Sequence, residues 1–261
     1  MEFPLPLAAE VERNALAALM EDIRGGDLTA QLVPGGRQSA GTVVSREPAV
    51  LAGQAWFDAC FRHLDPQAEI RWRAQDSDLV APDQVLCEIQ ADTRALLTAE
   101  RAALNFLQLL SGTATITREY VAAVAGTGAR IVDTRKTLPG LRLAQKYAVR
   151  CGGGTNHRLG LYDGILIKDN HIIAAGGIPQ VLAQARGLAS GASFIQIEVE
   201  SLEQLAEALD CGATMILLDN MDLQQMRQAV GLTAGRAELE ASGEIGRARV
   251  GKECRSRWSP Y

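Results

Sequence analysis

Short apolar segments alternate with helical patterns along the second half of this 261-residue chain. Short apolar segments of this kind are typical of strands in a parallel sheet that is buried on both faces. Between them, apolar residues recur at the spacing of amphipathic helices. We therefore predict a parallel β/α arrangement whose repeat, roughly twenty residues, is short even for a barrel. Strands are expected at residues 130–134, 164–168, 193–200, 214–220 and 237–242, and helices near residues 140–150, 178–189, 201–210 and 222–230.

The sequence pattern of the first half is different, and it predicts a small α+β unit that ends near Ser111. Apolar residues at helical spacing predict a helix over residues 8–24, and Asp27 is a candidate cap for the segment that follows. Strands are expected within residues 40–52 and 68–90, with a helix near 53–63. A long helix is expected over residues 93–110, with Thr93 as its cap and an apolar face of Leu96, Leu97, Leu104, Leu107 and Leu110.

Charge and composition narrow the class of protein. The formal net charge is −5, which argues against a general nucleic-acid or anionic-membrane binder. The start of the chain has no basic, apolar signal pattern, and no apolar run approaches the length of a membrane-spanning helix. Its five cysteines are scattered without CxxC spacing, which favours a reduced, cytoplasmic protein without structural zinc.

Positive charge is concentrated in one glycine-rich stretch, residues 130–171, which holds eight Lys and Arg against three Asp and Glu. An acidic chain with such a stretch is expected to bind an anion there. A solvated basic helix face is the alternative, and it fits Arg142, Lys146 and Arg150, which are spaced four apart. It does not fit the residues that end apolar runs or adjoin glycines, namely Arg135, Lys136, His157, Arg158 and Lys168.

Polar groups also end each predicted strand of the second half. Because the C-terminal ends of parallel strands carry the functional groups of β/α barrels, these groups are candidates for a site. Glu198 and Asp219 are the strongest candidates, because an unpaired carboxylate inside an apolar strand costs free energy. Structural salt bridges inside the barrel are the alternative. The series is Asp133, Arg135 and Lys136, then Lys168, Asp169 and Asn170, then Glu198 and Glu200, then Asp219 and Asn220, then Glu240 and Ser242.

Other candidates carry weaker signals. Gly152, Gly153 and Gly154 would suit an anion-binding nest of backbone N–H groups, although a flexible turn explains them as well. Cys151 is interpreted as structural, because a cysteine nucleophile needs a nearby base. His157 and His171 lack the close spacing of a metal pair. No dinucleotide-binding or P-loop motif is present.

These residues resemble the quinolinate phosphoribosyltransferase family from about residue 8 to residue 243. The longest matching stretch is residues 133–171, and few other families would produce it. The matching segments are GDLTA (26–30), ERAALNFLQLLSGTAT (100–115), DTRKTLPGLR (133–142), KYAVRCGGGTNHRLGLYDGILIKDNH (146–171), IEVESLEQL (197–205), LLDNM (217–221) and EASG (240–243).

The resemblance implies an α/β fold, in which an N-terminal α/β hammerhead-like domain (1–111) precedes an incomplete, open TIM-like β/α barrel (112–243). It implies a transferase of NAD biosynthesis that converts quinolinate and 5-phosphoribosyl 1-diphosphate to nicotinate mononucleotide, diphosphate and CO₂. The implied cofactor is Mg²⁺, which would bind through the substrate diphosphate near Glu198 and Asp219. The implied assembly is a homodimer or larger homo-oligomer.

The resemblance also implies a role for each matching residue. Glu198 and Asp219 would bind ribose hydroxyls and the Mg²⁺ shell, and Ser242 and Gly243 would begin the 5′-phosphate site. Arg101 would reach quinolinate in the neighbouring subunit. Lys136, Lys168, Glu198 and Asp219 are thus the catalytic candidates. Arg135, His157, Arg158 and Lys168 would bind the quinolinate carboxylates, and Lys136 and Lys168 would neutralise diphosphate.

After Gly243 the sequence is expected to leave the family pattern in an atypical basic tail, residues 244–261, read either as disordered or as a frame-shifted end. Two alternatives to an active enzyme therefore stay open. One is a catalytically impaired homologue that binds quinolinate, and the other is a related transferase that acts on another carboxylated ring.

Overall fold

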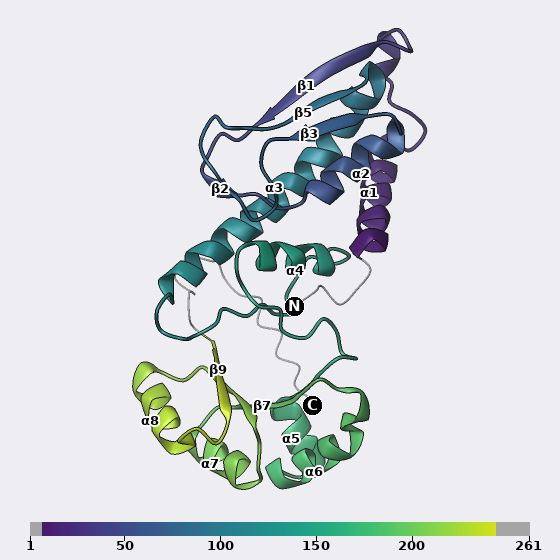
Figure 1. The fold of residues 1–261 in the computed structure, drawn as a ribbon. Coiled ribbons are helices and arrows are strands. Elements are labelled where there is room, and N and C mark those ends of the chain that lie inside the picture. The colour runs from purple at the N-terminus through teal and green to yellow at the C-terminus, as the bar shows by residue number, and fades with distance from the viewer. Residues whose placement is uncertain (1–6, 244–261) are drawn as a thin grey trace. The chain divides into compact units, whose positions relative to one another are not determined.

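The computed structural model describes residues 7–243, and the chain divides into two units, Met1–Leu159 and Gly160–Tyr261 (Figure 1). The predicted tail lies outside the described residues. In the first unit the elements are α1 (Leu7–Ile23), η1 (Ala30–Leu32), β1 (Gln38–Val44), β2 (Ala49–Val50), α2 (Gln54–Leu64), β3 (Glu69–Trp72), β4 (Leu79–Val80), β5 (Val85–Asp92), α3 (Thr93–Ala123) and α4 (Arg142–Cys151). In the second they are β6 (Ile165–Ile167), α5 (Asp169–Ala175), α6 (Ile178–Leu188), η2 (Ala189–Gly191), β7 (Ile195–Val199), α7 (Leu202–Asp210), β8 (Met215–Asp219), α8 (Leu223–Thr233) and β9 (Glu238–Ser242).

The first unit is built on a three-stranded antiparallel sheet with β5 between β1 and β3. Residues of β5 alternate between buried and exposed along most of the strand, as expected when one face of a sheet packs on a core. Helices α1, α2 and α3 lie on that side of the sheet (Figure 1). Three aromatic residues of α2 fill the core between them, and they are Trp56, Phe57 and Phe61.

Helix α3 begins at Thr93, as predicted, but its cap lies one residue earlier than predicted and the helix runs well beyond its predicted end. Asp92 is the cap, because its carboxylate accepts from the N–H groups of Arg94 and Ala95 at 2.9 and 3.2 Å. The Thr93 hydroxyl donates instead to a backbone carbonyl. Past Ser111 the helix continues, with hydroxyls of the next turns bonded to carbonyls four residues earlier. Gly112 is therefore an interior helical residue and not a stop.

The second unit is a four-stranded parallel sheet in the order β6-β7-β8-β9, and three of its strand pairs follow one another in the chain. Apolar residues on one face pack against α6 and α7 in a single core that includes Ile167, Ile197 and Leu218. The sheet does not close on itself, since β6 and β9 each have one neighbour among the described strands. The α/β fold class and the open, unclosed parallel sheet agree with the prediction.

One predicted strand is wrong. Residues 130–134 form only a single parallel bridge, between Val132 and Thr155. The next residue, Asp133, pairs its carboxylate with the buried Lys146. The predicted burial of the parallel sheet on both faces holds for β7 and β8, since Gln196 and Leu217 are buried on the face opposite the helices.

The predicted domain boundary at residue 111 falls inside the continuous helix α3, and the two structural units divide later, between Leu159 and Gly160. The division into residues 1–111 and 112–243 therefore stays a prediction about the family's domains.

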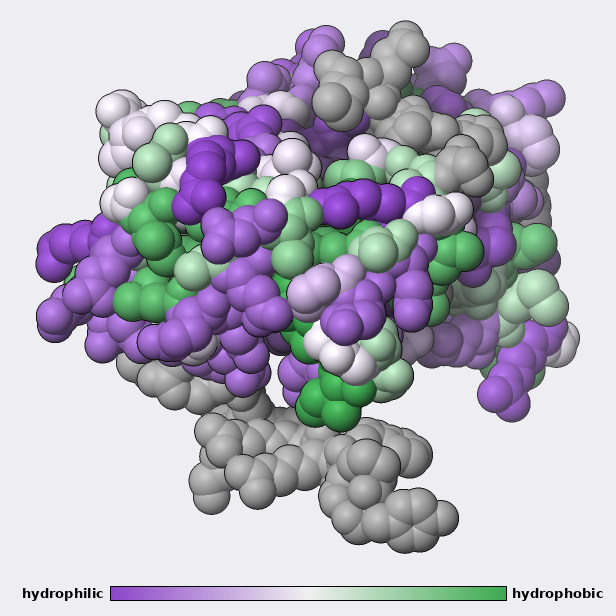
Figure 2. All heavy atoms as spheres, turned by 90° about the horizontal axis from the view of Figure 1, so that it is seen from below, coloured by the Kyte–Doolittle hydropathy of each residue, from purple (hydrophilic) through white to green (hydrophobic). Residues whose placement is uncertain are grey.

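No helix in residues 7–243 is long and apolar enough to cross a membrane. Hydrophobic residues stand among hydrophilic ones on the face that Figure 2 shows.

Candidate functional site

Two irregular segments of the first unit, residues 133–137 and 155–159, lie side by side. The N–H of Asp133 donates to the Thr155 carbonyl at 3.1 Å, and the N–H of Thr155 donates to the Ile131 carbonyl at 2.8 Å. The segments bring together four of the predicted site residues, and these are Arg135, Lys136, His157 and Arg158.

A buried ion pair joins these segments to α4. Lys146 of α4 donates its Nζ to Asp133, and their side chains are 1% and 7% exposed. Asn156 donates to the other carboxylate oxygen at 2.6 Å, and the N–H of His157 donates to the first at 2.9 Å. Lys146 therefore corrects the interpretation of α4 as a solvated basic face. A periodicity of four cannot distinguish a cation that faces solvent from one that faces a buried carboxylate.

Arg142, one turn before Lys146, is the second cation that α4 directs at the segments. Its guanidinium donates to the carbonyls of Arg135 and Leu159 at 3.4 and 3.3 Å, and to the Thr137 hydroxyl at 3.3 Å. Lys146 and Arg142 of α4 thus donate hydrogen bonds to backbone carbonyls of the two segments. The sequence did not indicate this role, because residue spacing does not show which groups a side chain contacts.

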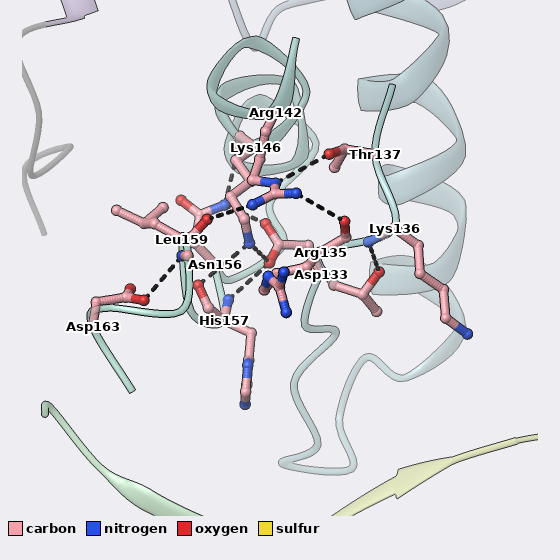
Figure 3. A network of polar contacts seen from close by, with 12 residues as sticks. Asp133, Arg135, Lys136, Thr137, Arg142, Lys146, Asn156, His157, Leu159 and Asp163 are labelled. Atoms are coloured by element: carbon pink, nitrogen blue, oxygen red, sulfur yellow. Dashed lines mark hydrogen bonds and ion pairs between the residues drawn. The ribbon is translucent and has the colours of Figure 1, made fainter. Parts of the chain in front are cut away.

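Two of the predicted anion-binding side chains, those of His157 and Lys136, extend away from the buried ion pair. The imidazole of His157 and the chain of Lys136 point away from the Asp133–Lys146 pair (Figure 3). Lys136 is exposed, whereas Arg135 is half-buried. The buried Nε of Arg135 has no hydrogen-bond acceptor among the described residues. An arginine with an unused planar N–H suits a carboxylate, which it binds with two parallel hydrogen bonds.

The three glycines after Cys151 serve packing against α3. A Cβ at Gly152 would lie 2.4 Å from the Ala114 carbonyl oxygen, and one at Gly154 would lie 2.9 Å from the Thr117 methyl. Arg118 of α3 also donates to the Gly152 carbonyl at 3.0 Å. Close approach therefore accounts for Gly152 and Gly154, and a φ of 89° accounts for Gly153, without an anion.

Cys151 has the surroundings of a structural cysteine. It is buried, and burial raises the pKa of its thiol, so the thiol stays protonated and a weak nucleophile at neutral pH. Arg101, by contrast, is exposed on α3 and borders a hollow with Glu21 and Asp22 of α1.

In the second unit, an ion pair spans the C-terminal ends of β6 and β7. Lys168, which follows β6 directly, donates Nζ to Glu198 Oε2 at 2.7 Å. The N–H of Lys168 donates to Nδ1 of His171 at 2.9 Å, so this histidine caps α5. The Lys168 side chain is 47% exposed and the Glu198 side chain 12%, which leaves the cation accessible to an anionic ligand.

The ends of β8 and β9 are joined through the backbone. Asp219 pairs with Ser242 in the parallel register, and the N–H of Asn220 donates to the Ser242 carbonyl at 3.0 Å. Asn220 has a φ of 55° and Gly243 a φ of 121°. A Cβ at Gly243 would lie within 2.8 Å of three Asn220 atoms, so the chain requires glycine there.

The register puts the predicted carboxylates on one face of the sheet. Glu198 pairs with Leu217, which pairs with Glu240, and Asp219 lies two residues after Leu217. Because side chains alternate between faces, Glu198, Asp219, Glu240 and Ser242 share the face opposite the helices. The second unit thereby brings together five predicted groups at one edge, and they are Lys168, Glu198, Asp219, Ser242 and Gly243.

Gln196 is a polar residue of this face that sequence reasoning missed. Its side chain is fully buried and donates to Glu240 at 2.8 Å. The only available signal was a glutamine inside an apolar run, two residues before Glu198.

The carboxylates suit Mg²⁺ bound mainly through a substrate. No group of three or more metal-binding side chains occurs in the described part of the chain. Glu198 is already paired with Lys168, and Asp219 accepts from Asn220 at 3.0 Å. One or two carboxylates are enough for Mg²⁺, which keeps several bound waters and binds substrate phosphates. They are too few to coordinate the ion with protein ligands alone.

Comparison with known proteins identifies the family. The N-terminal domain model of quinolinate phosphoribosyl transferase matches residues 27–111, and the C-terminal domain model matches residues 113–256. The chain belongs to the quinolinate phosphoribosyltransferase family. The second match extends beyond Gly243, where the sequence was expected to leave the family pattern.

Known members of this family align with this chain over most of their length. A probable carboxylating nicotinate-nucleotide pyrophosphorylase of Bacillus subtilis is 43% identical over 226 residues, which cover 87% of this chain and 78% of the relative. The corresponding protein of Mycobacterium leprae is 46% identical over 238 residues, covering 87% and 82%. The structure of the nicotinate-nucleotide pyrophosphorylase from Francisella tularensis has a TM-score of 0.89 at 41% identity, covering 94% of this chain and 86% of that chain.

Proposed function

We propose that this chain is a carboxylating nicotinate-nucleotide diphosphorylase of NAD biosynthesis. It converts quinolinate and 5-phosphoribosyl 1-diphosphate to nicotinate mononucleotide, diphosphate and CO₂. The observation that carries this proposal is the match to both domains of the family, with relatives of that name at 43% and 46% identity.

The cationic residues of the first unit support binding of quinolinate. Arg135, His157 and Arg158 are assigned to its two carboxylates, together with Lys168. The guanidinium of Arg135 suits this role, since its planar donors match a carboxylate. Lys136, which is exposed, and Lys168 are assigned to the diphosphate.

The strand ends of the second unit support binding of the phosphoribosyl group. Glu198 and Asp219 are assigned to ribose hydroxyls, and Ser242 with Gly243 to the 5′-phosphate. Mg²⁺ near Glu198 and Asp219 would neutralise charge on the diphosphate when it is bound.

The reaction needs no protein nucleophile. The pyridine nitrogen forms a bond to C1′ as the bond from C1′ to the diphosphate breaks, and the cations of Lys136 and Lys168 stabilise the charge that develops on the leaving group. The carboxylate beside the now cationic nitrogen then leaves as CO₂, its bonding electrons pass to the ring, and a proton replaces it. Orientation and electrostatics supply the rate.

A cytoplasmic homodimer is part of the proposal. The four cysteines described, Cys60, Cys87, Cys151 and Cys211, are free, as is usual in a reduced compartment. Exposure of Arg101 on α3 supports its assignment to quinolinate of a neighbouring subunit.

Product analysis tests the proposal. The chain is incubated with Mg²⁺, phosphoribosyl diphosphate and either quinolinate or nicotinate, and nicotinate mononucleotide is measured by chromatography. We expect product from quinolinate and none from nicotinate. Binding of quinolinate without product would favour an impaired homologue, and turnover of a different carboxylated ring would favour a related transferase.

A further inference from the structure

Both backbone groups of His157 are held by buried side chains of opposite charge. Its N–H donates to Asp133 at 2.9 Å, and its carbonyl accepts from Lys146 Nζ at 3.3 Å. The two side chains are also paired with each other. One ion pair therefore fixes the peptide groups on either side of a predicted substrate-binding residue (Figure 3).

The pair is also attached to its own elements. Asp133 opens the segment that carries Arg135 and Lys136, and its N–H donates to Thr155. Asn156 donates to Asp133 at 2.6 Å and to the Lys146 carbonyl at 2.9 Å. These bonds connect residues 133–137, residues 155–159 and α4 in one network.

Stability alone is a weak reason to keep such a pair. Removing two charges from water is costly, and well-packed apolar residues often replace a buried ion pair without loss. A buried ion pair that hydrogen-bonds several backbone groups fixes the direction of those groups, which an apolar pair cannot do. Here the backbone groups belong to the segments that carry the anion-binding side chains.

We propose that Lys146 and Asp133 are positioning residues, which hold residues 133–137 and 155–159 so that Arg135, Lys136, His157 and Arg158 present their charges in a fixed arrangement. The catalytic part of this inference rests on the proposed function. The side chains of Lys146 and Asp133 are 1% and 7% exposed, and both are already bonded within the network. They act through the residues they hold.

The test compares neighbouring residues of α4. Lys146→Met removes the cation but keeps an unbranched side chain. Tyr147→Phe is the matched control, because it breaks the 2.7 Å hydrogen bond from the Tyr147 hydroxyl to Asp76 elsewhere in the same core. Asn156→Ala is a milder variant that loosens the network without leaving a charge unpaired. Thermal unfolding of each variant is measured first, and kinetics are recorded well below the unfolding temperature.

We expect the KM for quinolinate to rise at least ~10-fold in Lys146→Met, because small displacements of binding groups have large kinetic effects. Asn156→Ala should raise it less, by about 3-fold, and Tyr147→Phe should leave it unchanged although it lowers stability. An unchanged KM in the folded Lys146→Met and Asn156→Ala variants would overturn the inference. Should Lys146→Met not fold, Asn156→Ala decides alone.

Hydrogen exchange separates this inference from the proposed function. If the wild-type chain made no nicotinate mononucleotide, the proposed function would fail, and the backbone claim would still be measurable. The amide of His157 should exchange at least ~10-fold faster in Asn156→Ala or Lys146→Met than in wild type or Tyr147→Phe. Equal exchange in all four proteins would contradict the positioning role.

Discussion

Lys168 and Glu198 form an ion pair of 2.7 Å between the ends of β6 and β7, and they are assigned to different substrate groups, Lys168 to carboxylate and diphosphate and Glu198 to ribose hydroxyls. The glutamate is the more buried partner, so the lysine keeps the accessible side of the pair. Such a pair can hold the lysine in place until an anion arrives, and then share it with that anion.

Lys168→Ala should therefore lower turnover about 10²-fold or more, as removal of one preorganised donor often does. Initial rates of nicotinate mononucleotide formation measure the effect. Arg236→Ala is the control, because Arg236 also pairs with a carboxylate of the second unit, Asp210, at 3.4 Å on the surface. Equal rates for Lys168→Ala and the control would remove Lys168 from the mechanism.

Gly243→Ala should raise the KM for phosphoribosyl diphosphate about 10-fold, because an alanine at a φ of 121° is strained and its Cβ would push Asn220 away from Ser242. Gly187→Ala in α6 is the control, since a Cβ there meets nothing within 4 Å. Steady-state kinetics of both variants make the comparison. An unchanged KM in Gly243→Ala would argue against a phosphate role for this turn.

Gly152→Ala should destabilise the first unit by about 1–3 kcal/mol, because its Cβ would lie 2.6 Å from the Thr117 Cβ as well as too close to the Ala114 carbonyl. Gly112→Ala, inside α3 with open space around it, should instead stabilise by up to about 1 kcal/mol. Urea unfolding of the two variants measures both. The prediction fails if Gly152→Ala is as stable as wild type.

Alkaline pH should destabilise the chain through two buried thiols. Burial raises the pKa of Cys60 and of Cys87 to about 12, whereas an unfolded cysteine titrates near about 8.5. The folded state keeps protons that the unfolded state loses, so stability is complete below the unfolded pKa. It then falls by up to ~1.4 kcal/mol per pH unit per thiol as pH rises toward 12.

Urea midpoints at increasing pH measure this loss. Cys60→Ala should lower stability at neutral pH and reduce the alkaline slope. Identical slopes for the variant and the wild type would show that the thiol does not contribute.

The sequence predicted the second unit more accurately than the first. All four strands of its sheet and three of its long helices fall within a few residues of their predicted positions, because short apolar runs alternate with amphipathic helices there. It also indicated that Lys168, Glu198 and Asp219 would share one edge, which follows from the parallel topology.

The errors concern features that depend on tertiary contacts. Lys146 and Arg142 have the spacing of a solvated stripe, and only the fold shows that they face Asp133 and backbone carbonyls. Residues 130–134 are apolar enough for a strand but have a single bridging partner. The end of α3 was missed because residues past Gly112, such as Ala114 and Thr117, are buried against the turn at Gly152, a tertiary contact that the sequence does not show.

Release of labelled CO₂ tests the central claim most directly. Quinolinate labelled in the carboxylate beside the ring nitrogen is given to the wild-type chain and to Lys136→Ala, with and without phosphoribosyl diphosphate and Mg²⁺. We predict one labelled CO₂ per nicotinate mononucleotide, release only with both additions, and a rate about 10²-fold lower in the variant. Release that does not need phosphoribosyl diphosphate, or no release at all from the wild-type chain, would contradict the account.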